Sequence, residues 1–487
     1  MVRGGGGAAQ PRASTAASLA CDGAARAHDR PAPRSPPRRA GEGRMSGRRH
    51  LLQASAWYPP YDLGGTEIYL QGLVGELAER GVESVIVVPR PDGAPQRYRH
   101  EGACVETYPV SGAATAHELR RGAPHAGFEE FRTVLARHSG AIYHQHSWTR
   151  GCGPQHLRAA HELGLRTVVT VHVGGAFCLR GTMMLRGEGP CDGFIDERRC
   201  AGCWAESRGL PKPLAMRLAS LPLGAARAAR RFASPVATAL SARALGAEKK
   251  RDLAEMIERA DRIVAVCGWL RDALVANGAP EKKLVVSRQG VTRGFLANAR
   301  ANPRRPRSGR LELLYLGRWH WTKGVDVVVR AIAALPRSLD LRLTMRGPEG
   351  GAEERAYKAD IRALVGDDPR FCFADAAPNA RLPEIMALHD CLVVPSLWLE
   401  TGPMVALEAQ ACGLFVLGSR LGGLAELLDG RGGGELVEAG SVEAWRDAIL
   451  RLAERGAENN VLRETNEPRT MAAAAADMIA LYDELAG

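Results

Sequence analysis

The feature that most constrains the fold is an alternation of short apolar runs with helical stretches, which occurs twice along the chain. The first series begins near residue 50 and the second near residue 311. Strands that alternate with helices favour a parallel sheet covered on both faces, with ligands at the carboxyl ends of the strands. The predicted strands of the first half are HLLQASAW, SVIVVP, AIYHQH, TVVTVH, RIVAVC and KLVVSRQG, and those of the second half are LELLYLG, LRLTMRG, RFCFA, CLVVPS and LFVLGS.

A Pro- and Arg-rich, non-periodic segment, residues 301–309, separates the two series and indicates an interdomain linker. We therefore expect an α/β chain with two doubly wound, Rossmann-like domains, at residues 47–300 and 310–465, and a C-terminal helix at 466–487. A Cys-bearing insertion is expected at 174–206. A cleft between two such domains is a favoured place for a ligand.

Charge limits the classes of partner. The net charge is +11, but the first fifty residues carry ten Arg against three acids, so seven of the excess charges lie there. The rest of the chain is only mildly basic, which argues against nucleic acid as the partner. Residues 1–46 are rich in Ala, Gly, Pro and Arg, and we expect either a disordered tail or a start of translation at Met45 instead of Met1.

Apolar patterning and cysteine usage indicate the compartment. No run of about 18 apolar residues occurs in the sequence, so no membrane span is expected. The eleven cysteines are spread along the chain without an export signal, which favours reduced thiols in a cytoplasmic protein. An Ala/Arg/Leu-rich helical region at about 205–251 has two interpretations, a helix on an anionic membrane surface or a solvated helix.

Two motifs of the first half lie where strands end. Gly64 and Gly65 join the first strand to the first helix, where free N–H groups favour an anionic group, and a plain tight turn is the alternative. His172 closes the strand TVVTVH, where the active-site residues of open sheets collect, and a structural histidine is the alternative. His144 and His146 share a face of the preceding strand and are expected to line the same cleft.

Two cations follow the first strand of the second half. Arg318 and Lys323 lie in the loop after LELLYLG, beside a helix start, with no acid before Asp326. Such a pair suits a diphosphate. Surface salt bridges are the alternative interpretation.

Two acids follow the strand CLVVPS in the run LWLETGPMVALEAQAC. Gly402 and Pro403 suit a turn into a helix that starts at Pro403, which places Glu400 in the loop and Glu408 inside the helix. Carboxylates at these positions accept hydrogen bonds from sugar or ribose hydroxyls. The alternative is that they only complement the positive end of the helix.

Taken together, the segments GGTE, TVHVGG, GRWHWTKG, RLTMRG, PSLWLETGPMVALEAQACG and SRLGGLAELL resemble the family 4 glycosyltransferases, retaining enzymes of the GT-B fold. The resemblance covers roughly residues 49–485. It implies a bacterial enzyme of polysaccharide biosynthesis, cytoplasmic or peripheral at the inner face of the membrane, that moves a sugar from a nucleotide-sugar donor to a glycan or lipid-linked acceptor. It also implies catalysis without a metal, and the chain has no Asp-x-Asp motif.

The resemblance also assigns roles to residues. It places His172 at the donor sugar, Arg318 and Lys323 on the diphosphate, Glu400 near the transferred sugar and Glu408 on the ribose hydroxyls. The other positions it assigns, on the nucleotide and its phosphates or on the acceptor, are Gly64, Gly65, Gly422, Gly423 and Glu426.

The chain departs from the family at one point of this pattern. Many members have Phe-Gly-Leu after the first glutamate, whereas this chain has Thr401-Gly402-Pro403-Met404. Proline has no N–H, so a sugar contact from the backbone here must come from Gly402, Met404 or Val405.

Four cysteines cluster in the insertion, namely Cys178, Cys191, Cys200 and Cys203. The last two have the C-x2-C spacing of metal ligands, and four thiolates satisfy a tetrahedral zinc ion. The sequence therefore suggests a structural zinc that braces the acceptor side of the cleft, and buried free thiols are the alternative. No cofactor is expected to be required for catalysis.

Two other functions compete with sugar transfer. A nucleotide-sugar epimerase would use the same fold and the same donor. A basic protein that binds a membrane or nucleic acid would use the tail and the helical region from about 208 to 251.

Overall fold

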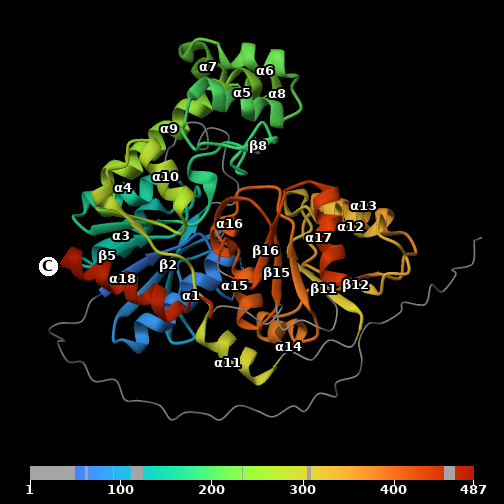
Figure 1. The fold of residues 1–487 in the computed structure, drawn as a ribbon. Coiled ribbons are helices and arrows are strands. Elements are labelled where there is room, and N and C mark those ends of the chain that lie inside the picture. Colours follow the sequence, from blue (N-terminus) through green and yellow to red (C-terminus); the bar gives the residue numbers. More distant parts are fainter. Residues whose placement is uncertain are drawn as a thin grey trace, which may run out of the picture. The chain divides into compact units, whose positions relative to one another are not determined.

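The structure, a computed structural model, describes residues 50–60, 64–91, 93–110, 124–232, 234–303, 309–430, 432–454 and 467–486. The predicted tail at 1–46 and most of the predicted linker, residues 304–308, lie outside these ranges. Met45–Gly487 is one compact unit that contains two large sheets. Figure 1 shows its helices and strands.

Eight strands form the sheet of the first half, in the order β10-β9-β6-β5-β1-β2-β4-β3. Neighbouring strands are parallel except for the β3–β4 pair, which is antiparallel. The sequence prediction missed β3, whose segment RYRH carries no apolar run, and β4, whose segment ACVETYPV has Glu106 and Thr107 between its apolar residues. The strands are β1 His50–Ala54, β2 Glu83–Pro91, β3 Arg97–His100, β4 Ala103–Val110, β5 Ile142–Gln145, β6 Arg166–Val171, β9 Arg262–Ala265 and β10 Leu284–Val286.

Six parallel strands form the sheet of the second half, in the order β13-β12-β11-β14-β15-β16. The chain builds the sheet outward from β11 in one direction and from β14 in the other. A crevice therefore opens at the carboxyl ends of this central pair, where open α/β sheets bind ligands. The strands are β11 Leu311–Leu316, β12 Leu341–Arg346, β13 Phe371–Ala374, β14 Cys391–Val394, β15 Phe415–Ser419 and β16 Gly434–Val437.

Helices flank both sheets. Those of the first half include α1 Gly65–Glu79, α3 Phe128–Arg137, α4 Pro154–Glu162, α9 Ala242–Arg259, α10 Gly268–Ala276 and α11 Arg293–Ala301. Those of the second half include α12 Val325–Ala333, α13 Ala352–Val365, α14 Leu382–Met386, α15 Met404–Ala411, α16 Gly422–Leu428 and α17 Val442–Glu454.

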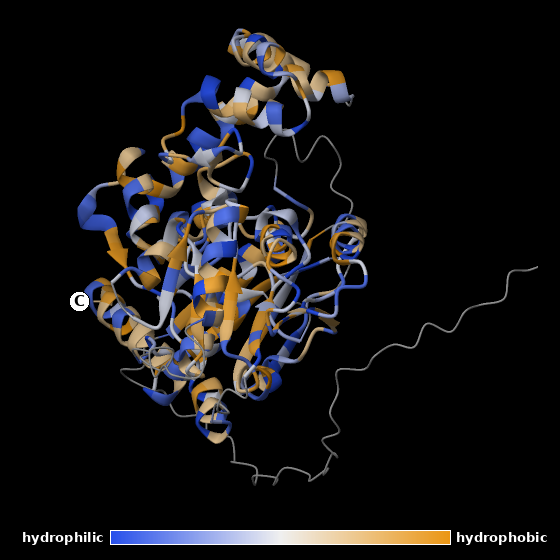
Figure 2. Cartoon of the chain, turned by 45° about the vertical axis from the view of Figure 1, so that its right-hand side comes forward, coloured by the Kyte–Doolittle hydropathy of each residue, from blue (hydrophilic) through white to orange (hydrophobic). Residues whose placement is uncertain are grey.

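The two faces of the second sheet bury separate cores. Leu313 and Tyr315 of β11 pack with one cluster, which includes Trp445 of α17, whereas Leu314 packs with the other, which includes Leu407 of α15. Successive side chains of a strand point to opposite faces, so a strand with apolar residues at every position is covered on both sides. Figure 2 accordingly colours most of the strands as hydrophobic.

The C-terminal helix α18, Met471–Ala486, returns to the first half of the chain. Met471 and Tyr482 lie in one buried cluster with Leu51 of β1 and Tyr69 of α1. The chain thus crosses between the two sheets twice, once between β10 and α11, which packs against α14 and α15, and once before α18 (Figure 1). This return places Tyr482 in the polar interior of the first half.

A helical region follows β6, as expected from the sequence. It begins with a 3-10 turn, Gly174–Ala176, and the short pair β7 Met184–Leu185 and β8 Gly189–Pro190. Four helices then pack around one another and on α9, namely α5 Glu197–Ser207, α6 Lys212–Ala219, α7 Leu223–Ala229 and α8 Pro235–Leu240. Within the described residues, no helix is both long and apolar enough to cross a membrane.

Candidate active site

Lys323 and Glu400 meet at the central crevice of the second sheet. Lys323 ends a 3-10 turn, Trp321–Lys323, in the loop after β11, and Glu400 lies in the loop after β14. The Lys323 Nζ is 2.6 Å from Glu400 Oε1. Glu400 is buried, at 6% exposure, and the lysine is 20% exposed at its side chain. Two predicted site residues thus form one charge-assisted hydrogen bond.

Two further donors fix the carboxylate of Glu400. The Ser396 Oγ and the Trp398 Nε1 both donate to Glu400 Oε1 at 2.8 Å. The Lys323 Nζ also lies 5.4 Å from the centroid of the Trp398 ring, in a cation–π contact. Ser396 and Trp398 were not predicted as site residues from the sequence, although both lie in the segment PSLWLE. Their roles depend on the course of the loop, which no spacing rule predicts.

Arg318 lies in a different environment from Lys323. Its side chain is 59% exposed, and its Nη1 is 3.7 Å from Glu354 Oε1. Such an exposed pair contributes little to stability, so the guanidinium can turn to a ligand at small cost. The two predicted cations therefore follow the same strand, but only Lys323 is held in a buried ion pair.

Glu408 lies inside α15, as the sequence predicted, and is 5% exposed. Burial raises the pKa of Glu408 to about 7, and a hydrogen bond from Asn379 opposes this shift. A buried carboxylate gains most from a ligand that donates hydrogen bonds to it. The contact of Glu408 with ribose hydroxyls stays a prediction.

The turn before α15 differs by one residue from the prediction. Pro403 is the N-cap and the helix begins at Met404, whereas the sequence pattern predicted a start at Pro403. Gly402 has a φ of +117°, which strongly favours glycine. Met404 and Val405 form the start of the helix, so their N–H groups are the ones left at its positive end.

Gly422 and Gly423 support the loop that carries Glu400. The Gly423 N–H donates to the Glu400 backbone oxygen at 2.6 Å, and a Cβ on Gly422 would lie 2.5 Å from the same oxygen. The Trp269 Nε1 of α10 donates to it as well, at 2.9 Å. Close backbone approach therefore explains the two glycines that the resemblance assigned to the nucleotide.

Glu426 binds the first half of the chain. Its carboxylate accepts from the N–H groups of Gly268 and Trp269, at 2.8 and 2.9 Å, and from Arg288 at 2.7 Å. These contacts cap the start of α10 and satisfy the charge of Glu426. The structure therefore places Glu426 in an interdomain contact, where the resemblance placed it beside the nucleotide.

His172 follows β6 and lies next to the Glu400 loop. The Thr401 Oγ1 donates to the His172 backbone oxygen at 2.8 Å. The imidazole is 5% exposed, and burial lowers its pKa to about 3, so the ring is neutral. With His146 and Trp57 it lines a cavity of about 180 Å³ at the carboxyl edge of the first sheet.

The start of α1 differs from the expectation of a free anion site. The Gly64 N–H donates to Glu67 Oε2 at 2.8 Å, so a side chain of the helix itself satisfies it. An anionic ligand at this N–H would have to displace Glu67. A Cβ on Gly65 would lie 3.9 Å from the Met404 side chain, so the start of α1 approaches the start of α15.

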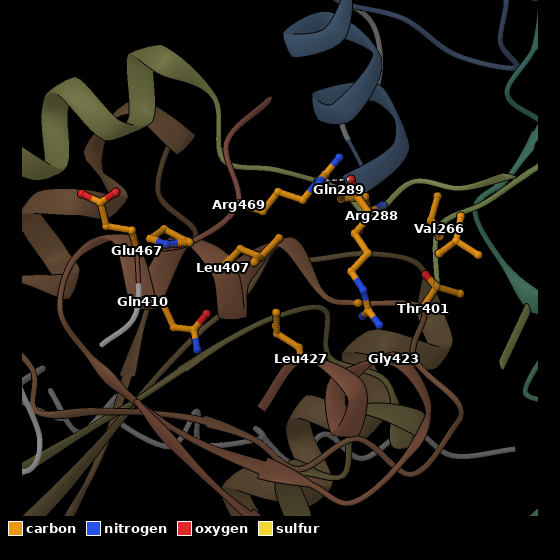
Figure 3. Close-up of a pocket in the computed structure, with 13 residues that line it drawn as sticks. Val266, Arg288, Gln289, Thr401, Leu407, Gln410, Gly423, Leu427, Glu467 and Arg469 are labelled. Carbon is orange, nitrogen blue, oxygen red and sulfur yellow. Dashed lines mark hydrogen bonds between the residues drawn. The ribbon is translucent and has the colours of Figure 1, made fainter. Parts of the chain in front are cut away.

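A larger cavity, of about 510 Å³, is lined by residues of both halves and of the segment before α18. Arg288 and Gln289 come from the first half, and Thr401 and Gly423 from the second (Figure 3). Arg469 donates to the Arg288 backbone oxygen at 3.0 Å. Of the residues predicted from the sequence, Gly402 and Gly423 line this cavity.

The four cysteines of the insertion gather around one narrow cavity. The Arg186 N–H donates to Cys203 Sγ at 3.2 Å, and burial raises the pKa of Cys200 to about 11. All four are free thiols, and no group of three or more His, Cys, Asp or Glu in the described ranges is arranged to hold a metal ion. The structure therefore brings the predicted ligands together without the tetrahedral arrangement that zinc requires.

Comparison with protein families matches both halves of the chain. Residues 310–455 match the family described as "Glycosyl transferases group 1", and residues 64–290 match "Glycosyl transferase 4-like domain". A similar curated protein is the D-inositol 3-phosphate glycosyltransferase of Pseudarthrobacter chlorophenolicus, 26% identical over 410 residues, which are 80% of this chain and 82% of that protein.

Solved structures share the fold. The sucrose-phosphate synthase of Thermosynechococcus elongatus superposes with a TM-score of 0.59 at 20% identity, over 90% of this chain and 99% of that one. HepE of Anabaena, in complex with UDP and glucose, gives a TM-score of 0.54 at 14% identity, over 89% and 99% of the two chains.

Glu408 gives a prediction for stability against pH. Its pKa in the folded chain, about 7, exceeds the ordinary value of 4.5, so its protonated form favours folding at low pH and this contribution is lost as the pH rises through 7. Relative to Glu408→Gln, the wild type should lose up to about 3 kcal/mol in free energy of unfolding between pH 5 and pH 8. Urea unfolding of both proteins at several pH values measures this difference, and a constant difference would contradict the prediction.

The structural zinc stays a prediction, and it requires the four thiols to turn toward the metal. Elemental analysis of the purified protein is expected to find about one zinc ion per chain. Replacement of Cys200 and Cys203 by Ser should abolish it, whereas the same change at Cys372 and Cys412, in the second half, should not. Fully folded protein without stoichiometric metal would contradict the prediction.

Proposed function

Because the chain belongs to the group 1 glycosyltransferases and has the GT-B fold, we propose that it moves a sugar, with retention of anomeric configuration, from a nucleotide-sugar donor to a carbohydrate or lipid-linked acceptor. The observation that carries the proposal is the meeting of Lys323, Glu400 and the His172 segment at the carboxyl edges of two sheets. Open α/β sheets bind nucleotides at such edges.

The leaving group needs fixed positive charge. As the bond to the anomeric carbon breaks, negative charge grows on the nucleotide diphosphate, and preorganised cations stabilise it. Lys323 has a fixed position beside the crevice, and the exposed Arg318 can turn toward it. These two cations, with the absence of an Asp-x-Asp motif from the sequence, support transfer that does not require a metal.

Glu400 and Lys323 exchange partners in this proposal. When a diphosphate takes up Lys323, the carboxylate of Glu400 keeps the donors Ser396 and Trp398 and has a lone pair left for a sugar hydroxyl. Glu408, within α15, accepts from the ribose. The N–H groups of Met404 and Val405 supply the backbone contacts that Pro403 cannot make.

The acceptor is the least constrained part of the proposal. The curated relative acts on D-inositol 3-phosphate by its name, so this compound belongs among the acceptors to be tested. An epimerase of the same fold would release free nucleotide, or an altered sugar, from the donor alone. Incubation of the enzyme with and without acceptor separates these two activities.

The first test concerns Lys323. Lys323→Ala should lower turnover by roughly a thousandfold, because the growing charge on the diphosphate loses its fixed cation. The measurement is release of nucleotide from a panel of nucleotide sugars, after thermal stabilisation has identified the donor. Lys250→Ala, on the exposed surface of α9, is the matched control and should keep full activity. Near-normal turnover of a folded Lys323→Ala protein would exclude the diphosphate role.

We also propose that helices α6 to α8 contact an anionic membrane surface, where a lipid-linked acceptor would lie. Residues 207–247 contain no acid and seven basic residues. Phe232 and Val236, at the turn between α7 and α8, are 67% and 69% exposed and are the two most exposed large apolar side chains of the described residues. The cations that are exposed and form no salt bridge with a described residue are Arg208, Lys212, Arg217, Arg227 and Arg231.

Sedimentation with lipid vesicles tests this contact. The protein should bind vesicles that contain phosphatidylglycerol more tightly than pure phosphatidylcholine vesicles, because each cation near an anionic surface contributes about 1 kcal/mol. Phe232→Ser with Val236→Ser should weaken binding at least about tenfold. The control is Leu163→Ser with Leu388→Ser, two exposed apolar residues elsewhere. Binding to DNA but not to these vesicles would contradict the proposal.

A further inference from the structure

A chain of buried polar side chains crosses the first sheet behind His172. Gln53 lies on β1, His144 on β5, and His146 directly after β5, and none of the three is more than 2% exposed. Tyr482 reaches the same interior from α18. Buried polar groups must satisfy one another, so their donors and acceptors are not independent.

Gln53 determines which nitrogen of His146 carries the hydrogen. Its Nε2 donates to the Tyr482 hydroxyl at 3.4 Å, and its Oε1 is 2.7 Å from His146 Nε2. A carboxamide oxygen can only accept a hydrogen bond. The Nε2 of His146 therefore carries its hydrogen.

The second proton follows from the first. Burial lowers the pKa of His146 well below its ordinary value, so the ring is neutral and has one N–H. Its Nδ1 is then an acceptor, and it lies 3.2 Å from His172 Nε2. Because the His172 ring is also neutral, its hydrogen lies on Nε2 and its Nδ1 carries a bare lone pair.

The Nδ1 of His172 has no partner among the described residues. It is fully buried, and the Tyr69 ring packs against the imidazole with centroids 4.9 Å apart. An unsatisfied buried acceptor is unfavourable, and a ligand hydroxyl removes the cost. Since His172 lines the cavity of about 180 Å³, the ligand that enters there is the available donor.

We propose that Gln53 and His146 are positioning residues that hold His172 in the Nε2–H tautomer, so that its Nδ1 accepts a hydrogen bond from a hydroxyl of the bound sugar. The identity of the ligand rests on the proposed function, whereas the tautomer does not. In this arrangement His172 selects a hydroxyl donor and acts neither as a cation nor as a proton donor toward the sugar.

The test reads the tautomer directly. In protein labelled with 15N-histidine and without substrate, NMR should show His172 protonated at Nε2 and not at Nδ1, with His172→Gln used to assign its signals. Gln53→Glu nearly preserves the side-chain shape but places a carboxylate beside His146. The imidazole of His146 should then become protonated, its Nδ1–H should donate to His172 Nε2, and His172 should switch to the Nδ1–H tautomer.

Activity gives the second readout. His146→Leu removes the acceptor and should release the tautomer preference and lower kcat/KM by roughly ten- to hundredfold. His146→Asn places an amide oxygen near the position of Nδ1 and should restore both the tautomer and most of the activity. The control is His50→Asn, which alters a half-buried histidine pair at the other end of β1.

The outcomes separate the two proposals. An Nδ1–H tautomer in the wild type, or a tautomer unchanged in folded Gln53→Glu protein, would overturn the relay. A confirmed tautomer in a protein that transfers no sugar from any donor would leave the relay intact and exclude the proposed function. Because Gln53→Glu keeps the size of the side chain, it tests the relay even if His146→Leu fails to fold.

Discussion

The site depends on the hydrogen bonds that Glu400 accepts, at its side-chain carboxylate and at its backbone oxygen. The side chain gathers Lys323, Ser396 and Trp398 at one oxygen atom, and the backbone oxygen gathers Trp269 and Gly423. A buried charge with fewer partners would be strongly destabilising. The loop after β14 therefore has one stable course, and this course places Thr401 against the His172 segment of the other sheet.

The same loop explains why the two halves are coupled. Trp269 lies in the first turn of α10, and Glu426 caps that helix from the opposite half, so the first turn of α10 is bound twice. The C-terminal helix adds a third connection, because the Tyr482 hydroxyl of α18 forms a hydrogen bond with the His144 Nδ1 in the interior of the first half. Relative movement of the halves must break hydrogen bonds next to Glu400, which links any opening of the cleft to the charges of the site.

Much of this could be predicted from the sequence, and the rest depends on tertiary contacts. The apolar runs predicted the strands that make up both sheet centres, and the positions of Lys323, His172, Glu400 and Glu408 followed from the ends of those strands. The pattern could not show that Glu67 satisfies the Gly64 N–H, because the direction of a side chain at a helix start is set by the loop before it.

The roles of the glycines and of Glu426 were hidden for a similar reason. A Gly-Gly pair at the start of a helix is compatible with a bound phosphate and with a second segment of backbone close to it. At Gly422 and Gly423 the position of the Glu400 loop shows that the close neighbour is backbone. The four cysteines show the same limit, since a spacing of two places Cys200 and Cys203 on one side of α5 but does not by itself set the direction of all four thiols. The spacing of residues in the sequence predicts which side chains lie near one another, whereas their directions in the structure determine what they can bind.

The charges of the two halves are complementary in the proposed reaction. The second half supplies cations, Lys323 and Arg318, where the diphosphate gains negative charge. The first half supplies a neutral imidazole, because burial keeps His172 uncharged, and the hydrogen bond to His146 holds its tautomer. In the proposed transfer, the sugar passes through a state with positive charge at the anomeric carbon. An imidazolium beside that carbon would raise the activation barrier of the reaction. A lone pair at His172 Nδ1 can orient a hydroxyl without that repulsion. In the proposed relay, Gln53 and His146 therefore keep His172 in the form that does not destabilise the transition state.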